Sequence, residues 1–160
     1  MKTYLGILFR ALLIALAASL VGLGINVVSS KPVPWTYVPP DALEISGFRV
    51  PLIDEKEARK LMDEQGTIFV DTRHKDDYDE KHVKGSIFLP QDDKEQQFIA
   101  VQPLLPEDAR LILYCYGPQC DMAEEVARFL EPLGYKKMMI MTAGFRAWEK
   151  AGYPVEGENK

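Results

Sequence analysis

The chain has 160 residues and a formal net charge of −5 at pH 7, a length that suits one domain plus an appendage. An acidic chain without a basic stripe argues against nucleic-acid binding and against docking on anionic lipid through a polybasic patch. Its two cysteines are too few for a disulfide framework, and neither of its two histidines has zinc-ligand spacing. We therefore expect no metal site and no cofactor.

Residues 1–29 are predicted to form a membrane anchor. No charged residue occurs from Ala11 to Val28, and these 18 residues would rise about 27 Å as a helix, close to the roughly 30 Å hydrocarbon core of a bilayer. Lys2 and Arg10 precede the span. By the positive-inside rule we expect a single-pass protein of the cell inner membrane whose following domain faces the periplasm or exterior.

A cleaved signal peptide is the alternative interpretation of this N-terminal segment. Ala15-Leu16-Ala17 resembles the small-residue site at which such peptides are cut. Cleavage there would leave a very apolar new N-terminus, which favours the uncleaved anchor.

Residues 30–47 are predicted to be a linker. Prolines at positions 32, 34, 39 and 40 make this stretch extended and fairly stiff. Trp35 and Tyr37 follow the span closely, where amphipathic aromatic side chains anchor at the membrane interface or pack on the domain surface.

Residues 48–157 are predicted to form one α/β domain. Short apolar runs predict strands at 67–71, 86–89, 111–114 and 138–141. Amphipathic patterns predict helices at 54–62, 76–81, 94–98, 121–133 and 143–151, the first and fourth opening with capping boxes (Asp54 with Glu57, Asp121 with Glu124). Apolar strands between such helices imply a parallel sheet covered on both faces, with sites beyond the carboxyl ends of its strands.

Residues 113–125 are the most informative segment of the chain. The strand ends on Cys115, a tight loop runs from Tyr116 to Cys120, and Asp121 opens the next helix. Backbone N–H groups and the helix dipole favour negative charge at such a place. We therefore expect a lowered thiol pKa and a reactive thiolate at Cys115.

Three stretches, in order, resemble the single-domain rhodanese family, a sulfurtransferase module, over about residues 48–155. The first is Val70-Asp71-Thr72-Arg73, followed by Tyr78 and residues 82–87, which is similar to the family's D-x-R … G-H-I-x-G-A signature. The second is Tyr114-Cys115 with its loop. The third is residues 143–155, which are similar to G-G-W-x-A-W-x-x-A-G-x-P-V. The resemblance implies the rhodanese fold, a parallel sheet flanked by helices on both faces.

The resemblance also implies a function. Cys115 would be the nucleophile that takes sulfane sulfur from a donor such as thiosulfate or a persulfide, becomes a persulfide and passes the sulfur to a thiol acceptor. Loop amides and the helix N-terminus would hold the anion, and Gly117 would let its amide turn inward. The expected active-site loop is Tyr116, Gly117, Pro118, Gln119, Cys120 and Asp121.

The chain departs from the family pattern at several positions. Lys81 replaces a glycine, and Ala143 and Phe145 replace Gly and Trp, all within structural motifs. The loop also lacks the Arg or Lys with which many rhodaneses hold an anionic donor, which puts thiosulfate as the natural substrate in doubt. Related phosphatases use a longer loop closed by Arg, so this loop argues against a phosphatase.

Cys120 has two possible roles, one functional and one structural. As a resolving thiol it would attack a Cys115 persulfide and leave an intraloop disulfide, giving a thiol–disulfide sensor. The favoured alternative is a small residue whose amide joins the loop cradle, because a disulfide needs strict Cα spacing. A catalytically silent interaction module is the third hypothesis, and the donor, the acceptor and the oligomeric state stay open.

Asp71 and Arg73 are predicted to support the site. A structural ion pair between them is favoured over a catalytic acid or a donor clamp. His74 and His82 are interpreted as structural, and the acidic run 76–80 as a solvated helix face with Tyr78 turned inward.

Overall fold

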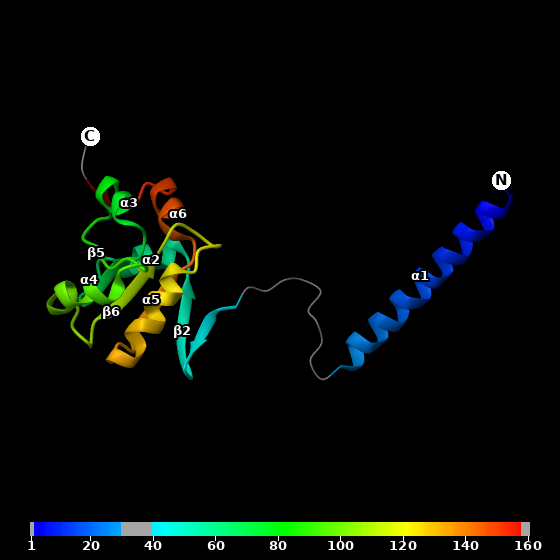
Figure 1. Cartoon of the computed structure of the whole chain (residues 1–160), viewed down its shortest axis with the longest axis horizontal. Helices are drawn as coiled ribbons and strands as arrows, with labels where there is room; N and C mark the ends of the chain where they lie inside the picture. Colours follow the sequence, from blue (N-terminus) through cyan, green and yellow to red (C-terminus); the bar gives the residue numbers. More distant parts are fainter. Residues whose placement is uncertain (1, 30–39, 158–160) are drawn as a thin grey trace. The chain divides into compact units, whose positions relative to one another are not determined.

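The computed structural model describes residues 2–29 and 40–157, which fall into an N-terminal unit and a domain that begins at Pro40. Helix α1 (Lys2–Val28) makes up the N-terminal unit (Figure 1). Its part from Gly6 to Val28 is long and apolar enough to cross a membrane, and a signal sequence has the same properties. The interfacial role predicted for Trp35 and Tyr37 lies outside the described residues.

The domain is built on a six-stranded sheet with the order β1-β2-β7-β6-β3-β5. The β1–β2 pair is antiparallel, and all the other neighbouring strands of this sheet are parallel. A second, small antiparallel sheet pairs β4 with β8. The strands are β1 (Ala42–Ile45), β2 (Phe48–Ile53), β3 (Thr67–Asp71), β4 (His82–Val83), β5 (Ile87–Phe88), β6 (Arg110–Tyr114), β7 (Met138–Met141) and β8 (Val155–Glu156).

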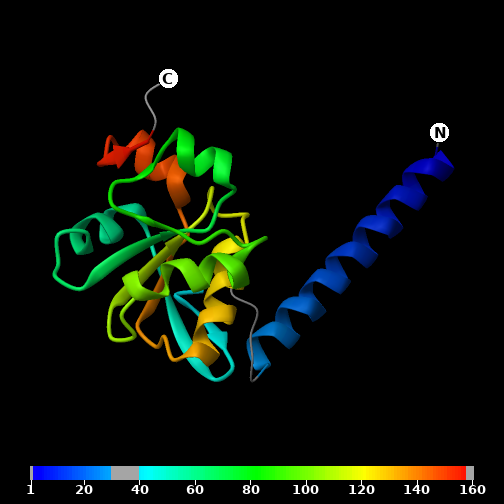
Figure 2. The ribbon, with the colours of Figure 1, turned by 60° about the vertical axis from the view of Figure 1, so that its left-hand side comes forward.

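Helices cover both faces of the large sheet. They are α2 (Glu55–Leu61), α3 (Lys75–Glu80), α4 (Lys94–Val101), α5 (Met122–Leu130) and α6 (Gly144–Lys150), with 3₁₀ turns η1 (Gln102–Leu104) and η2 (Glu131–Leu133). Figures 1 and 2 show α4 and α5 close together, and the Phe98 and Phe129 rings join them.

The sequence of the central strand β6 explains why both faces of the large sheet are covered by helices. Leu111 and Leu113 belong to the core cluster that contains the buried residues of α5, whereas Ile112 and Tyr114 belong to the cluster that contains Ala58 of α2 and Trp148 of α6. Successive side chains of a strand point to opposite faces, so an uninterrupted apolar run needs cover on both. The predicted fold class is thereby confirmed.

Some local predictions differ from the structure. Strand β1 lies within residues 30–47, predicted to be a linker, and pairs with β2. The Asp54 side chain caps α2, as expected, by accepting bonds from the amides of Lys56 and Glu57. The cap predicted at Asp121 is wrong, because Asp121 has helical backbone angles and makes no side-chain capping bond.

The pairing of β3 with β6 brings Asp71 next to the strand end that leads into Cys115. Strands β3 and β6 are neighbours, and Asp71 is paired with Tyr114, the residue before Cys115. The ends of both strands therefore lie at the carboxyl edge of the sheet, where open α/β sheets form their sites.

Candidate active site

The cysteine loop begins where β6 ends and is fixed to the start of α6. The amide of Phe145 donates to the carbonyl oxygen of Cys115 at 2.8 Å, and that of Arg146 to the carbonyl oxygen of Tyr116 at 3.3 Å. Gly144 permits this approach, because its φ is +67° and a Cβ there would lie 2.4 Å from the amide nitrogen of Gly117. Gly144, rather than the predicted Gly117, is the glycine that the loop requires.

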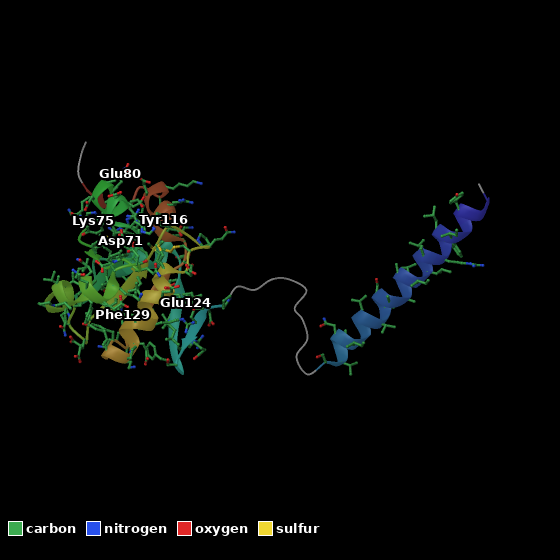
Figure 3. The ribbon with its side chains drawn as sticks, in the orientation of Figure 1. Asp71, Lys75, Glu80, Tyr116, Glu124 and Phe129 are labelled. Atoms are coloured by element: carbon green, nitrogen blue, oxygen red, sulfur yellow. A yellow bond between two sulfur atoms is a disulfide. The ribbon has the colours of Figure 1, made fainter. Side chains whose placement is uncertain are left out.

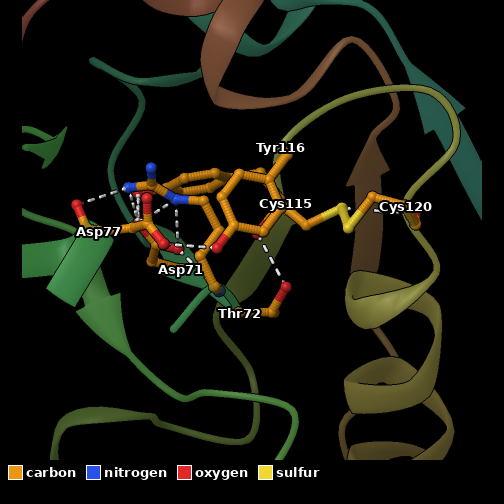
Figure 4. Close-up of a disulfide and its surroundings, with 8 residues drawn as sticks. Asp71, Thr72, Asp77, Cys115, Tyr116 and Cys120 are labelled. Atoms are coloured by element: carbon orange, nitrogen blue, oxygen red, sulfur yellow. Dashed lines mark hydrogen bonds and ion pairs between the residues drawn. A yellow bond between two sulfur atoms is a disulfide. The ribbon is translucent and has the colours of Figure 1, made fainter. Parts of the chain in front are cut away.

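The two cysteines form a disulfide across the loop (Figure 4). Their Cα atoms are 6.4 Å apart, within the range that a disulfide spans. Cys115 is buried in the core cluster that includes Ala123 of α5, whereas Cys120 is half-buried. The favoured interpretation of Cys120 as a small cradle residue therefore differs from the structure.

The amide of Cys120 does not take part in the predicted cradle. It donates to the carbonyl oxygen of Gly117 at 3.1 Å and so closes a turn within the loop. The Sγ atom of Cys115 lies 3.3 Å from the carbonyl oxygen of Cys120. The conformation of the loop is therefore set by its internal turn and by the hydrogen bonds from α6. Asp121, at the end of the loop, is exposed.

Behind the loop, Asp71 and Arg73 form the expected ion pair. Asp71 is fully buried and Arg73 is 3% exposed, and the guanidinium donates to the carboxylate from Nε at 3.0 Å and from Nη2 at 2.7 Å. Burial lowers the pKa of Arg73, but the hydrogen bond and charge of Asp71, together with Tyr114 and Asp77, raise it overall. The guanidinium therefore keeps its charge, and its bonds to the carboxylate hold the pair in a fixed geometry.

The ion pair ties the neighbouring elements to the residue before the nucleophile. Tyr114 donates from its hydroxyl to Asp71 at 2.7 Å and accepts from the amide of Val83 at 3.1 Å. Arg73 also donates to the carbonyl oxygen of Lys81 at 2.7 Å. The end of α3, β4 and β6 thus share one buried network, which positions the backbone entering the loop.

Tyr116 contacts this network through Asp77 and Arg73. Its hydroxyl donates to Oδ2 of Asp77 at 2.5 Å, and the guanidinium groups of Arg73 and Arg146 lie 5.7 and 5.8 Å from its ring centroid. Figure 3 shows Tyr116 and Asp71 toward the same end of the domain. Partial burial, together with the hydrogen bond and charge of Asp77, raises the pKa of Tyr116 to about 12.

We expect this phenol to be measurable in a spectrophotometric pH titration. One tyrosine should titrate near pH 12, disappear in Tyr116→Phe and shift down in Asp77→Asn, because the carboxylate favours the neutral phenol. A raised folded-state pKa stabilises the fold below the unfolded value of about 10, and this stabilisation is lost as pH rises toward 12. An unchanged titration in Tyr116→Phe would refute this assignment.

Gly117, Pro118 and Cys120 of the loop line two cavities. One, of about 160 Å³, is lined by Cys115, Cys120, Glu124 and apolar residues that include Leu43 and Leu52. The other, of about 700 Å³, is lined by residues 116–120 together with Ala143, Arg146, Ala147 and Lys150 of the α6 segment. The sequence indicated no cation at the loop, but the fold brings two to it from α6.

Arg146 and Lys150 line the larger cavity beside the loop, and sequence reasoning did not single them out. Both belong to the third family motif, which was interpreted as structural. Their spacing of four residues on a helix was the available signal, because it places both side chains on one face.

His74, His82 and Tyr78 make contacts that fit the structural roles predicted for them. Nδ1 of His74 lies 3.3 Å from Oδ2 of Asp92. The ring of His82 stacks on the ring of Tyr78, and the two ring centroids are 3.8 Å apart. Tyr78 is half-buried and donates to the carbonyl oxygen of Ser86 at 2.8 Å. Within residues 2–29 and 40–157, no group of three or more His, Cys, Asp or Glu side chains could hold a metal ion.

The sheet order and the strand-end cysteine loop define an α/β domain whose central parallel strand leads into a cysteine-containing loop. The family model for the rhodanese-like domain matches residues 54–151, so the chain belongs to the rhodanese-like family, as the motifs predicted. The chain is 32% identical over 104 residues to thiosulfate sulfurtransferase GlpE of Haemophilus influenzae, covering 65% of this chain and 92% of that protein. It is also 23% identical to the uncharacterized protein YibN of Escherichia coli, over 67% of this chain and 73% of that protein.

Solved structures share the fold of this domain. The BH2092 protein of Bacillus halodurans has a TM-score of 0.58 and 26% identity, covering 66% of this chain and 75% of that chain. The rhodanese-like domain of Anabaena Alr3790 has a TM-score of 0.57 and 21% identity, covering 68% and 80%. The second similarity concerns the fold alone.

Proposed function

We propose that the reduced protein is a rhodanese-type sulfurtransferase in which Cys115 carries the sulfur. The observation that carries the proposal is the position of Cys115, at the carboxyl end of the central strand and beside the start of α5, in a chain of this family. The N-terminus of a helix carries partial positive charge and unpaired N–H groups, which stabilise a thiolate or persulfide anion.

The chemistry has two steps, written here for thiosulfate. The Cys115 thiolate attacks the outer sulfur, the S–S bond of the donor breaks, and sulfite leaves with the electron pair while Cys115 becomes a persulfide anion. An acceptor thiol then takes the outer sulfur as its own persulfide, and Cys115 returns to the thiolate. The cavity of about 160 Å³ borders Cys115, and because its lining carries no cation, thiosulfate is expected to be a poorer donor than a persulfide whose charge lies away from the sulfur.

In this proposal the loop and the buried network have separate roles. The loop, residues 116–121, shapes the space around the sulfur. Asp71 and Arg73 act as positioning residues, because they contact Tyr114 and the end of α3 rather than either cysteine.

A donor screen tests the proposed function. The full chain in mild detergent is reduced, freed of reductant and incubated with thiosulfate, mercaptopyruvate, polysulfide or glutathione persulfide. At least one donor should add the mass of one sulfur atom to the wild type, measured on the intact protein. No gain of sulfur from any donor would contradict the proposal.

The disulfide favours a second candidate function, a thiol–disulfide sensor. Under mild oxidant such a sensor loses both thiols together and gains no sulfur, because Cys115 and Cys120 pair with each other. Titration of free thiols against oxidant tests it. Loss of one thiol at a time would exclude the sensor.

We further propose that α1 anchors the domain at the inner membrane, with the domain on the periplasmic or exterior side. The apolar segment from Gly6 to Val28 supports this topology, together with Lys2 before the segment and Arg10 near its start. Protease added to intact spheroplasts should digest the domain. A protected domain would reverse the orientation, and release of the protein by alkaline carbonate would exclude the anchor.

A further inference from the structure

The two cysteines of the disulfide differ in their exposure and in the cavities that they border. Cys115 is 4% exposed, and among the two cavities at the loop it borders the one of about 160 Å³. Cys120 is half-buried and borders both that cavity and the one of about 700 Å³. The larger cavity has the size of a small-molecule site, and the cysteine it presents is Cys120.

The larger cavity is basic in an acidic protein. Its charged lining residues are Arg146 and Lys150, both exposed on the same side of α6, whereas the whole chain has a net charge of −5. Within the part of the chain that the structure describes, neither side chain forms an ion pair. Arg146 also borders a separate cavity that contains Asp77, Glu80 and Glu149, which weakens its field. The two charges are therefore best tested together.

The smaller cavity has the opposite character. Its one charged lining residue is Glu124, whose carboxylate is paired with Arg128, and most of its other lining residues are apolar. An anion is disfavoured there by the carboxylate and by the lack of polar partners. Charge and size together direct an anionic molecule to the side of the loop where Cys120 lies.

We propose that the cavity lined by Arg146 and Lys150 binds a small anionic thiol and directs its sulfur to Cys120. The thiolate attacks Sγ of Cys120, a new S–S bond forms between them, the Cys115–Cys120 bond breaks, and the electron pair leaves on Sγ of Cys115. A second molecule of the small thiol then attacks the small-molecule sulfur of the mixed disulfide. The products are the disulfide of the two small thiols and the free thiol of Cys120. Two thiols are oxidised and one disulfide is reduced, so the electrons balance.

This regiochemistry has a consequence for the protein. Attack at Cys120 makes Cys115 the leaving group, so Cys115 is released as a thiolate, the form that nucleophilic chemistry requires. The inference does not depend on the proposed sulfur transfer, since reduction of the disulfide can be followed without any sulfur donor.

Mapping of the mixed disulfide tests the site of attack. The oxidised full chain in detergent is treated with glutathione, a tripeptide thiol of net negative charge, quenched in acid at early times and alkylated at low pH. Peptide mass analysis should find glutathione on Cys120 and the alkyl group on Cys115. Glutathione found mainly on Cys115 would overturn the proposal, as would two free thiols in the oxidised protein before treatment.

A charge series tests the cavity. The double variant Arg146→Gln, Lys150→Gln should slow reduction by glutathione about tenfold at low ionic strength, without slowing reduction by cysteamine, a cationic thiol. The matched control is Lys136→Gln, Lys137→Gln, which removes two charges just before β7, at the opposite edge of the sheet. An equal effect of the two double variants on glutathione, or an equal loss with both thiols, would contradict a specific anion site.

Discussion

Substitution of Cys115 by serine should reduce sulfur transfer by roughly a thousandfold or more, the scale seen when a covalent nucleophile is removed. A serine hydroxyl is nearly the size of the thiol but cannot form a persulfide at neutral pH. The turnover of the reduced full chain is measured in detergent with the donor that loads the wild type and with a thiol acceptor. Both proteins should unfold at the same urea concentration under reducing conditions, which ensures that the loss is chemical.

Cys120→Ser is the matched control for this prediction. It makes the same change five positions along the same loop and removes the disulfide partner without removing the proposed nucleophile. This variant should still gain one sulfur atom from the donor. Turnover that persists in Cys115→Ser, or a Cys120→Ser protein that takes up no sulfur, would contradict the role given to Cys115.

Substitution of Arg73 by methionine should destabilise the domain by about 3–5 kcal/mol, a large part of the roughly 5–15 kcal/mol that stabilises a typical domain. The buried carboxylate of Asp71 would lose its charged partner in a place that water does not reach. The guanidinium also packs 4.0 Å from the ring centroid of Phe145, and methionine replaces only part of this contact. Urea unfolding followed by tryptophan fluorescence measures the change.

Two control variants show how much of the lost stability comes from leaving a buried charge without its partner. Arg59→Met breaks the pair between Arg59 of α2 and the exposed Asp63 just after this helix, and should cost less than about 1 kcal/mol. The double variant Asp71→Leu, Arg73→Met should be more stable than Arg73→Met, because no unpaired charge then remains buried. If Arg73→Met costs no more than Arg59→Met, the network does not hold the loop as described.

The family motifs and the hydrophobic pattern were sufficient for the fold. Apolar runs predicted β3 at its observed bounds and β6 to within one residue, because strands buried on both faces have a strong sequence signal. The pair of Asp71 and Arg73 was also predictable, since their spacing after a buried strand suits an ion pair. Both are properties of local sequence.

The errors come from contacts between distant segments. Strands β4 and β8 have two residues each and exist through their mutual pairing, so neither carries a pattern of its own. The need for Gly144 arises from the approach of residue 117, and the cations at the loop come from α6. The state of Cys120 depends on the positions of two Cα atoms, which spacing along the chain does not define.

The central claim is that Cys115 is the covalent carrier of sulfur. The most direct measurement loads the reduced full chain with a donor, removes the excess, and follows the Cys115 and Cys120 peptides by mass as an acceptor thiol is added. We expect one additional sulfur on the Cys115 peptide, which then disappears and is recovered in the acceptor at the rate of turnover. Sulfur that resides on Cys120, or a Cys115 adduct that the acceptor does not discharge, would contradict the account.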